Sequence, residues 1–128
     1  MKFIEFAVIK DEENELPIPT SWRPTFIEIV SCFCAHDYGI QSGILGVAPM
    51  SFKTEKQIEE YIKSYGEELV ELSEQTWISS VCIWMGEWWE VLIDLCTASE
   101  GVSDLVLRTK VLESENGYFF QVEMVYVP

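Results

Sequence analysis

The chain has 128 residues, enough for one domain with a substantial core, and 48% of them are hydrophobic, which excludes a disordered chain. Its 22 acidic and 8 basic residues give a net charge of −14, which excludes direct binding to nucleic acid and to anionic membranes. The charge is uneven, because residues 67–128 carry 12 acids and 2 bases, a net of −10. Such a field speeds encounters with a basic partner, but it also keeps an apolar protein soluble, and both interpretations stay open.

The cysteines and the single histidine, His36, do not form a metal-binding pattern. No C-x-x-C pair is present, so we expect no zinc site and no cofactor. An acid within residues 1–5 argues against a secretory signal, and no apolar stretch approaches the ~20 residues that cross a bilayer. We therefore expect a cytoplasmic protein whose thiols are reduced and mostly buried, on Cys32, Cys34, Cys82 and Cys96.

The chain begins with a predicted strand over residues 3–9 and an acidic loop, after which Pro17 and Pro19 argue against regular structure. Apolar residues at helical spacing then predict a helix to about residue 35. We expect Ser21 to be its N-cap and Gly39 to be the glycine that ends it.

A second helix is predicted from the capping-box pattern that Thr54 and Gln57 form, and Gly66 is expected to end it. Residues 44–47 predict a short extended segment between the two helices. Residues 67–74 predict a short acidic turn of helix.

The second half of the chain predicts a meander of four strands, over residues 77–85, 88–97, 104–113 and 118–127. Gly86 and the pair Asn116-Gly117 supply the tight turns. Alternation places Trp89, Val91, Ile93 and Leu95 on one face, together with Leu105, Leu107, Val111, Tyr118, Phe120, Val122, Met124 and Tyr126. The other face carries a cross-strand charge ladder, which we interpret as setting strand register: Glu90, Asp94, Arg108, Lys110 and Glu123.

These elements predict an α+β fold in a single domain over residues 1–128, with two N-terminal helices packed on a curved antiparallel β-meander of four to five strands. A cone-like sheet of the cystatin or NTF2 type is the alternative architecture.

Catalytic patterns are absent from the sequence, so we expect a protein that is not an enzyme. His36 and Asp37 are neighbours on a helix and do not face each other, and we interpret His36 as a residue near the negative end of the helix dipole. No phosphate loop, G-x-S-x-G elbow or H-E-x-x-H motif is present. The acids Glu67, Glu68, Glu71 and Glu74 are read as a solvated face.

Tryptophan and acidic residues form the predicted partner-binding site. Four of the five tryptophans lie within residues 77–89, and Trp84 and Trp88 flank the turn at Gly86. Tryptophan is over-represented among binding hot spots, and we expect two of these rings to be buried and two to be available to a partner. The predicted partner-binding residues are Trp84, Glu87, Trp88, Glu90, Asp94, Glu67, Glu71 and Glu74.

Residues 94–105 read D-L-C-T-A-S-E-G-V-S-D-L, which resembles the D-L-W-T-x-E-E-G-x-S-D-L signature of a family of small bacterial domains without assigned function. The chain departs from that signature at Cys96 and Ser99. Ile29-Val30, Asp37-Tyr38 and the closing residues 125–127 are also similar to the family. We interpret Glu100-Gly101 as residues that form a turn, with a glycine free to adopt a positive φ.

By its profile the chain is similar to the immunity proteins of contact-dependent growth inhibition, a class of toxin–immunity system. That resemblance implies a protein that binds a basic toxin domain, expected to be a nuclease, and covers its active site. Two alternatives stay open. One is a small-molecule-binding or weakly catalytic cone-like domain. It would have an enclosed pocket lined by tryptophan and tyrosine, with one or two polar groups such as His36 or Asp94 pointing into it. The other is an acidic mimic of nucleic acid that acts on a basic regulator.

Overall fold

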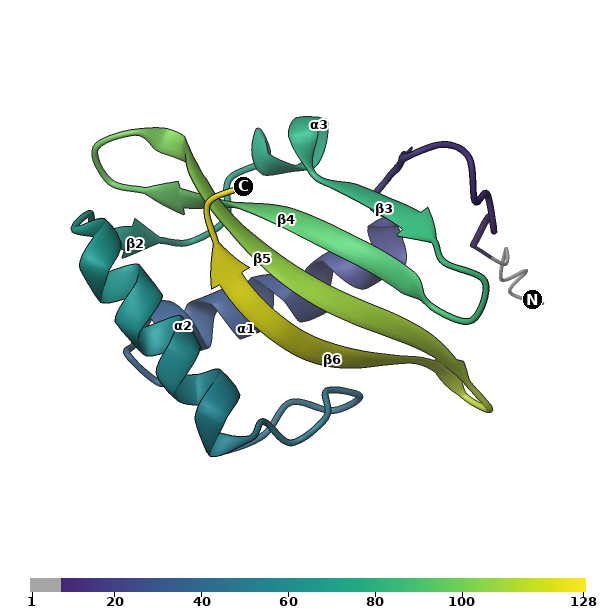
Figure 1. Ribbon diagram of the computed structural model, residues 1–128, viewed down its shortest axis with the longest axis horizontal. Helices are drawn as coiled ribbons and strands as arrows, with labels where there is room; N and C mark the ends of the chain where they lie inside the picture. Colours follow the sequence, from purple (N-terminus) through teal and green to yellow (C-terminus); the bar gives the residue numbers. More distant parts are fainter. Residues whose placement is uncertain (1–7) are drawn as a thin grey trace, which may run out of the picture.

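The computed structural model describes residues 8–128 and shows an α+β fold (Figure 1). The predicted strand over residues 3–9 falls mainly on residues 1–7, outside the described part, and Val8 and Ile9 lie in no strand. In chain order the elements are β1 (Leu16–Pro17), the 3-10 helix η1 (Thr20–Trp22), α1 (Arg23–Cys34), α2 (Phe52–Tyr65), β2 (Leu69–Val70), α3 (Thr76–Ser79), β3 (Val81–Trp84), β4 (Trp89–Thr97), β5 (Gly101–Ser114) and β6 (Gly117–Tyr126).

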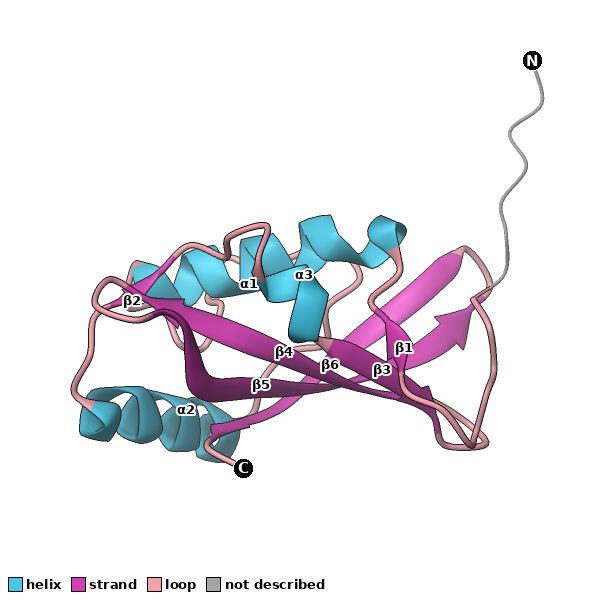
Figure 2. Cartoon of the chain, turned by 90° about the horizontal axis from the view of Figure 1, so that it is seen from above, coloured by secondary structure: helices cyan, strands magenta, loops and turns pink. Residues whose placement is uncertain are grey.

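The strands form one antiparallel sheet in the order β1-β3-β4-β5-β6, and β2 pairs with the end of β4 that β3 does not reach. β3–β4 and β5–β6 are hairpins, as the glycine turns predicted. The sheet is strongly twisted, and its long β5–β6 hairpin extends beyond the N-terminal end of α1 (Figures 1 and 2). The predicted α+β class, with helices before a C-terminal meander, is confirmed.

One face of the sheet, which we call the inner face, packs against α1. The apolar stripe of this helix is fully buried, as its helical spacing predicted: Phe26, Ile29, Val30 and Phe33. It meets the strand residues Val91, Ile93 and Leu107, each 0% exposed. Burying a side chain of this size contributes about 1.5–3 kcal/mol, so this layer is the main source of stability.

α2 lies along the edge of β6 instead of over the centre of the inner face (Figures 1 and 2). The side-chain amide of Gln57 donates to the carbonyl oxygen of Val125 at 2.7 Å and accepts from the Val125 amide at 3.1 Å. The Tyr61 hydroxyl accepts from the amide of Val127 at 3.1 Å. The helix therefore takes the place of a further strand at this edge.

The ends of both helices differ from the prediction. Ser21 is not the N-cap of α1, because the chain enters this helix through η1 and Trp22 stands at the cap. Ser51, not Thr54, caps α2: its backbone is extended and its hydroxyl accepts from the Thr54 amide at 3.1 Å. Gln57 is thus free to bond β6. The predicted stop at Gly66 is confirmed, since it adopts a left-handed φ of 83°.

Gly39 does not end α1. The helix ends three residues earlier, where His36 takes the left-handed conformation with a φ of 63°. The His36 amide bonds to the Phe33 carbonyl at 3.0 Å and the Asp37 amide to the Cys32 carbonyl at 2.8 Å, which closes a Schellman motif. These two bonds satisfy helix-terminal carbonyls before the chain reaches Gly39.

Three predictions near the sheet edges were wrong. Residues 76–79 form α3 instead of the first half of a strand, because the hydroxyls of Thr76 and Ser80 bond the backbone of Asp94 and replace strand pairing there. Residues 69–70 form β2, not a helical turn, because they pair with the free end of β4. Pro17 does belong to a strand, β1, at the sheet edge, where a missing amide proton is tolerated.

A β-bulge reverses the predicted facing of the end of β6. Thr109 pairs with Val122, but the preceding residue, Arg108, pairs with Met124. Glu123 is therefore an extra residue in β6 that has no partner in β5. Val125 therefore points to the inner face and is 0% exposed. Met124 and Tyr126 point to the opposite face, because one extra residue inverts a period of two.

Candidate protein-binding face

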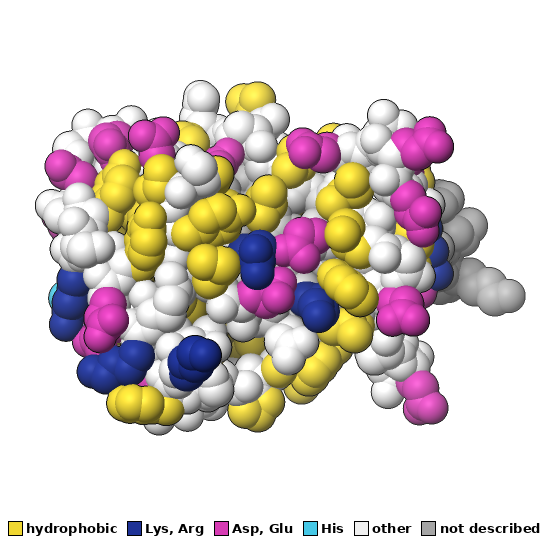
Figure 3. Space-filling model, viewed as in Figure 1, with side chains coloured by type: hydrophobic (Ala, Val, Ile, Leu, Met, Phe, Trp, Pro, Cys, Tyr) yellow, Lys and Arg dark blue, Asp and Glu magenta, His cyan; other side chains and the backbone are white. Residues whose placement is uncertain are grey.

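In the described part of the chain, the centre of the sheet face that points away from α1 has no helix over it, and α2 flanks this face at the β6 edge (Figures 1 and 2). We call it the outer face. Its apolar side chains are half-buried, apart from the buried Val106, and come from β3 to β6: Val81, Ile83, Leu92, Val106, Leu112, Met124 and Tyr126. Figure 3 shows hydrophobic side chains across this face. An uncovered apolar sheet face of this kind is a candidate interaction site.

A cluster of three charged side chains lies within this apolar surface. The Nε atom of Arg108 lies 3.1 Å from Oε1 of Glu90 and 3.6 Å from Oε1 of Glu123. All three atoms are inaccessible to solvent, and none of them makes a hydrogen bond of ordinary geometry. The attraction of opposite charges holds Arg108 beside both carboxylates. Burial raises the pKa of Glu90, and the Glu123 carboxylate raises it further, while Arg108 opposes both effects.

Trp88 stands beside this cluster at the start of β4. The ammonium group of Lys110 lies 4.2 Å from the centre of its ring, within the range of a cation–π contact. Its indole Nε1 is buried and has no hydrogen-bond partner among the described residues. The Arg108 side chain, which is 39% exposed, and the half-buried Trp88 thus present polar and aromatic surface to a partner.

The four clustered tryptophans divide between the two faces. Trp77 and Trp89 are buried, at 7% and 1% exposed, while Trp84 and Trp88 are half-buried. Trp84 pairs with Trp89 across the hairpin and packs on it, with ring centres 4.5 Å apart, so it belongs to the inner face. Lys10 covers the Trp84 ring at 5.0 Å. The structure therefore separates Trp84 from Trp88.

The predicted acids also lie in two groups. Glu90 and Asp94 lie on the outer face, with Glu87 exposed in the turn beside them. The exposed Glu67, Glu71 and Glu74 lie along the segment from β2 to α3, where Glu67 accepts a hydrogen bond from Ser99 and Glu71 accepts one from Ser31 of α1. Only the first group shares a surface with Trp88.

Sequence reasoning missed the apolar part of this face. Leu92 and Leu112 alternate with inner-face residues, so the signal for them was present in the strand period. Met124 and Tyr126 carried no such signal, because the bulge that turns them outward is not visible in the sequence.

Charge surrounds the apolar area unevenly. In Figure 3 acidic side chains lie along the upper and right margins of this face, while basic side chains gather at the lower left, over α2. A partner that covers the centre and the acidic margins would therefore meet mainly negative charge.

The cysteines and His36 show no activated nucleophile. Burial raises the pKa of both Cys34 and Cys82 to about 11, which keeps these thiols protonated at neutral pH. His36 is exposed, its ring stacks on Tyr38 with centres 6.1 Å apart, and it lines a shallow cleft of about 400 Å³ between the C-terminal ends of α1 and α2. Asp94 is not among the residues that line this cleft.

Residues 8–128 contain no group of three or more histidine, cysteine or acidic side chains placed to hold a metal ion. None of the helices described for this stretch has both the length and the apolarity needed to cross a membrane.

The turn between β4 and β5 holds the D-L-x-T-x-x-E-G-x-S-D-L residues. The Thr97 hydroxyl donates to the Glu100 carboxylate at 2.9 Å and accepts from the Glu100 amide at 3.2 Å. Gly101 is left-handed, with a φ of 73°. Ser103 donates to the Leu95 carbonyl at 2.7 Å, beside a bulge in β4. The residues of the motif thus hold the backbone of the β4–β5 turn in place.

A family model described as "Domain of unknown function (DUF7668)" matches residues 30–128 of the chain. The chain belongs to this family. No curated protein and no solved structure matches it.

The DUF7668 match begins within α1 and includes β3 to β6, so the whole outer face and the β4–β5 turn lie inside it. β1, η1 and the first part of α1 precede it.

Proposed function

We propose that this protein is a non-catalytic binding protein that neutralises a basic toxin domain, of the kind found in nucleases, by covering its active site with the outer face. The observation that carries the proposal is an uncovered apolar sheet face that holds incompletely bonded charged groups in a molecule of net charge −14.

The chemistry of the outer face supports a protein partner. Stable interfaces combine an apolar centre with a polar rim, and arginine and tryptophan supply much of the binding energy. Here Arg108, whose side chain is 39% exposed, and the half-buried Trp88 stand among aliphatic side chains. A partner that packed on the Trp88 ring and supplied acceptors to the accessible part of the Arg108 guanidinium would stabilise a buried complex.

The charge of the molecule supports a basic partner. Residues 67–128, which include all of β3 to β6, carry the larger share of the acidic excess. Opposite charge raises the rate of association, and apolar anchors lower the rate of dissociation. A nucleic-acid-binding cleft is basic and would be attracted to such a surface.

The test is co-expression with the toxin encoded directly beside this protein. We expect growth to be rescued and the two proteins to be purified together. The double variant Leu92→Ser, Met124→Ser should weaken binding by about 100-fold or more, because it removes two apolar contacts from the centre of the outer face.

Ile78→Ser is the matched control, since Ile78 is 81% exposed on α3, outside the outer face, and its change should leave binding intact. Circular dichroism checks that each variant is folded. A folded double variant that rescues growth and binds as well as the wild type would show that the outer face is not the interface. Absence of any neighbouring toxin, with no protection against basic nuclease toxins, would exclude the proposal.

A further inference from the structure

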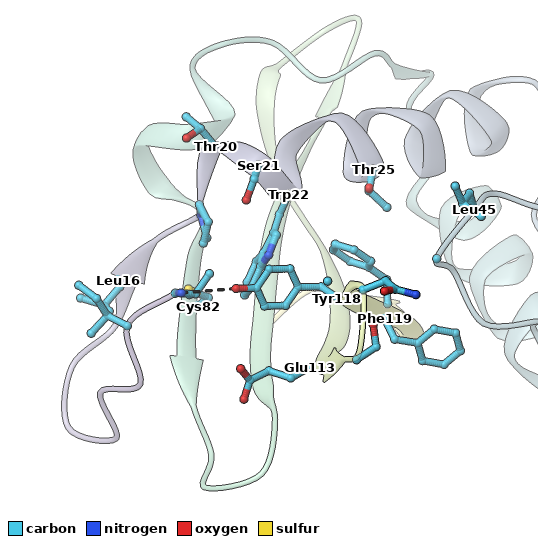
Figure 4. Close-up of a pocket in the computed structure, with 18 of the residues that line it drawn as sticks. Leu16, Thr20, Ser21, Trp22, Thr25, Leu45, Cys82, Glu113, Tyr118 and Phe119 are labelled. Carbon is cyan, nitrogen blue, oxygen red and sulfur yellow. Dashed lines mark hydrogen bonds between the residues drawn. The ribbon is translucent and has the colours of Figure 1, made fainter. Parts of the chain in front are cut away.

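A second concave site lies on the inner side of the sheet, where the β5–β6 hairpin extends past the beginning of α1. This hairpin cleft has a volume of about 1190 Å³ and is open to solvent. Figure 4 shows Trp22 and Tyr118 at its centre, with Leu16 toward one end and Leu45 and Phe119 toward the other. Its length therefore runs from β1, past η1, to the loop between α1 and α2.

The cleft is lined by aromatic and aliphatic side chains together with two carboxylates. Trp22 and Tyr118 pack edge to face with ring centres 5.3 Å apart and form a rigid floor. Glu113 and Glu115 of the hairpin supply the carboxylates; Glu113 is paired with Lys10 at 2.6 Å, while Glu115 is exposed. The described lining residues include no lysine or arginine. A ligand with apolar groups and a positive charge is therefore matched to this surface.

Leu45 is exposed to solvent at one end of the cleft, on a loop that is fixed to β6. It is 100% exposed and lies between the left-handed residues Gly43 and Gly46. Two backbone hydrogen bonds of 2.8 Å fix this loop to β6, from the Phe120 amide to the Gly46 carbonyl and from the Ala48 amide to the Phe120 carbonyl. Phe119, beside it, is 41% exposed. Large apolar side chains on a fixed backbone suit a protein contact.

We infer that the hairpin cleft binds an extended peptide segment with alternating apolar and basic side chains. The volume of this open cleft exceeds the roughly 300–1,000 Å³ of typical small-molecule pockets. An extended segment would place apolar side chains on Tyr118 and Leu45, and basic ones beside Glu115 and, in exchange with Lys10, beside Glu113. The inference is independent of the proposed function, because the cleft opens on the inner side of the sheet.

The test uses the full chain and three labelled peptides of about eight residues, a length that spans a typical strand. One alternates leucine and lysine, one replaces lysine with glutamate, and one replaces leucine with serine. Fluorescence anisotropy measures binding. We expect saturable binding of the leucine–lysine peptide and at least about tenfold weaker binding of the other two.

Charge-neutral variants locate the site. The variant Leu45→Ser should weaken binding of the leucine–lysine peptide by about tenfold. The matched variant Ile78→Ser changes another highly exposed aliphatic residue, outside the cleft, and should leave binding unchanged. Likewise Glu115→Gln should weaken binding more than Glu60→Gln, an exposed acid on α2 that removes the same charge.

Equal effects within each matched pair would show that the peptide binds by net charge alone and would overturn the inference. So would the absence of saturable binding. Binding of tryptamine, a small aromatic amine, with no binding of the peptide would assign the cleft to small molecules instead.

Discussion

His36 occupies a backbone conformation that glycine normally takes. Its φ of 63° is needed because the Schellman motif at the end of α1 requires a left-handed residue after the cap. For a residue with a Cβ atom this conformation costs about 1–2 kcal/mol, so the sequence is not optimal for stability here.

We predict that His36→Gly raises the free energy of unfolding by about 0.5–1 kcal/mol, since relief of the left-handed strain exceeds the added entropy of the unfolded chain. Urea unfolding measures the change. His36→Val, a β-branched residue in the same position, should lower stability. A less stable His36→Gly protein would show that the contact between the rings of His36 and Tyr38 outweighs the strain.

Glu90 illustrates how a single carboxylate responds to its place in the sheet. Burial and the neighbouring Glu123 hold its pKa above the ordinary value of 4.5, although Arg108 acts in the opposite direction. The folded protein therefore binds a proton at Glu90 more readily than the unfolded chain does. The contribution of Glu90 to stability is complete below pH 4.5 and is lost as the pH rises through its raised pKa.

We predict that the stability of Glu90→Gln relative to wild type increases as the pH rises from about 4.5 through the raised pKa of Glu90, because glutamine does not ionise. Urea unfolding of both proteins over a pH series measures the difference. Nuclear magnetic resonance titration supplies the control, since Glu123→Gln should lower the pKa of Glu90. If the relative stability falls with rising pH, attraction by Arg108 outweighs burial.

At the scale of elements, α2 and the loop before it protect the edge of β6. An open edge strand presents unpaired backbone groups to other chains. Here Phe120 is bonded by the loop, Val125 by Gln57 and Val127 by Tyr61. The helix therefore both contributes to the core and closes the sheet.

We predict that Gln57→Ala lowers the free energy of unfolding by about 1–3 kcal/mol, because the amide and carbonyl of Val125 lose their partners. Hydrogen exchange at the Val125 amide should become faster. Glu60→Ala, on the exposed side of the same helix, is the control and should change neither quantity appreciably. Unchanged exchange at Val125 would indicate that the side-chain amide does not hold this edge.

For the whole molecule, charge is the dominant property. A net charge of −14 makes the compact state repel itself, and the described residues form only five ion pairs to offset this. Salt screens the long-range repulsion, whose range is about 10 Å at 0.1 M ionic strength.

We predict that the midpoint of urea unfolding at neutral pH rises when NaCl increases from about 10 to 300 mM. Sodium sulfate is a poor substitute, because it also strengthens apolar burial. A midpoint that falls with NaCl would mean that local ion pairs, such as Arg108 with Glu90, stabilise the fold more than the net charge destabilises it.

The sequence by itself determined the elements whose signals are local. Helical spacing from Phe26 to Phe33 and strand alternation from Trp89 to Leu95 decide which side chains are buried, and Gly66 and Asn116-Gly117 end their elements through backbone preference alone. Of the predicted partner-binding residues, Glu87, Trp88, Glu90 and Asp94 lie together, and their role in binding stays a prediction.

Tertiary structure decided everything that depends on a distant partner. β2 and β1 are strands because β4 and β3 offer them free edges, and Gln57 bonds Val125, 68 residues away, instead of capping its own helix. The bulge in β6 turns Met124 and Tyr126 outward, which completes the apolar outer face. Local sequence patterns do not specify such pairings, because backbone groups take whichever partner the assembled sheet places within reach.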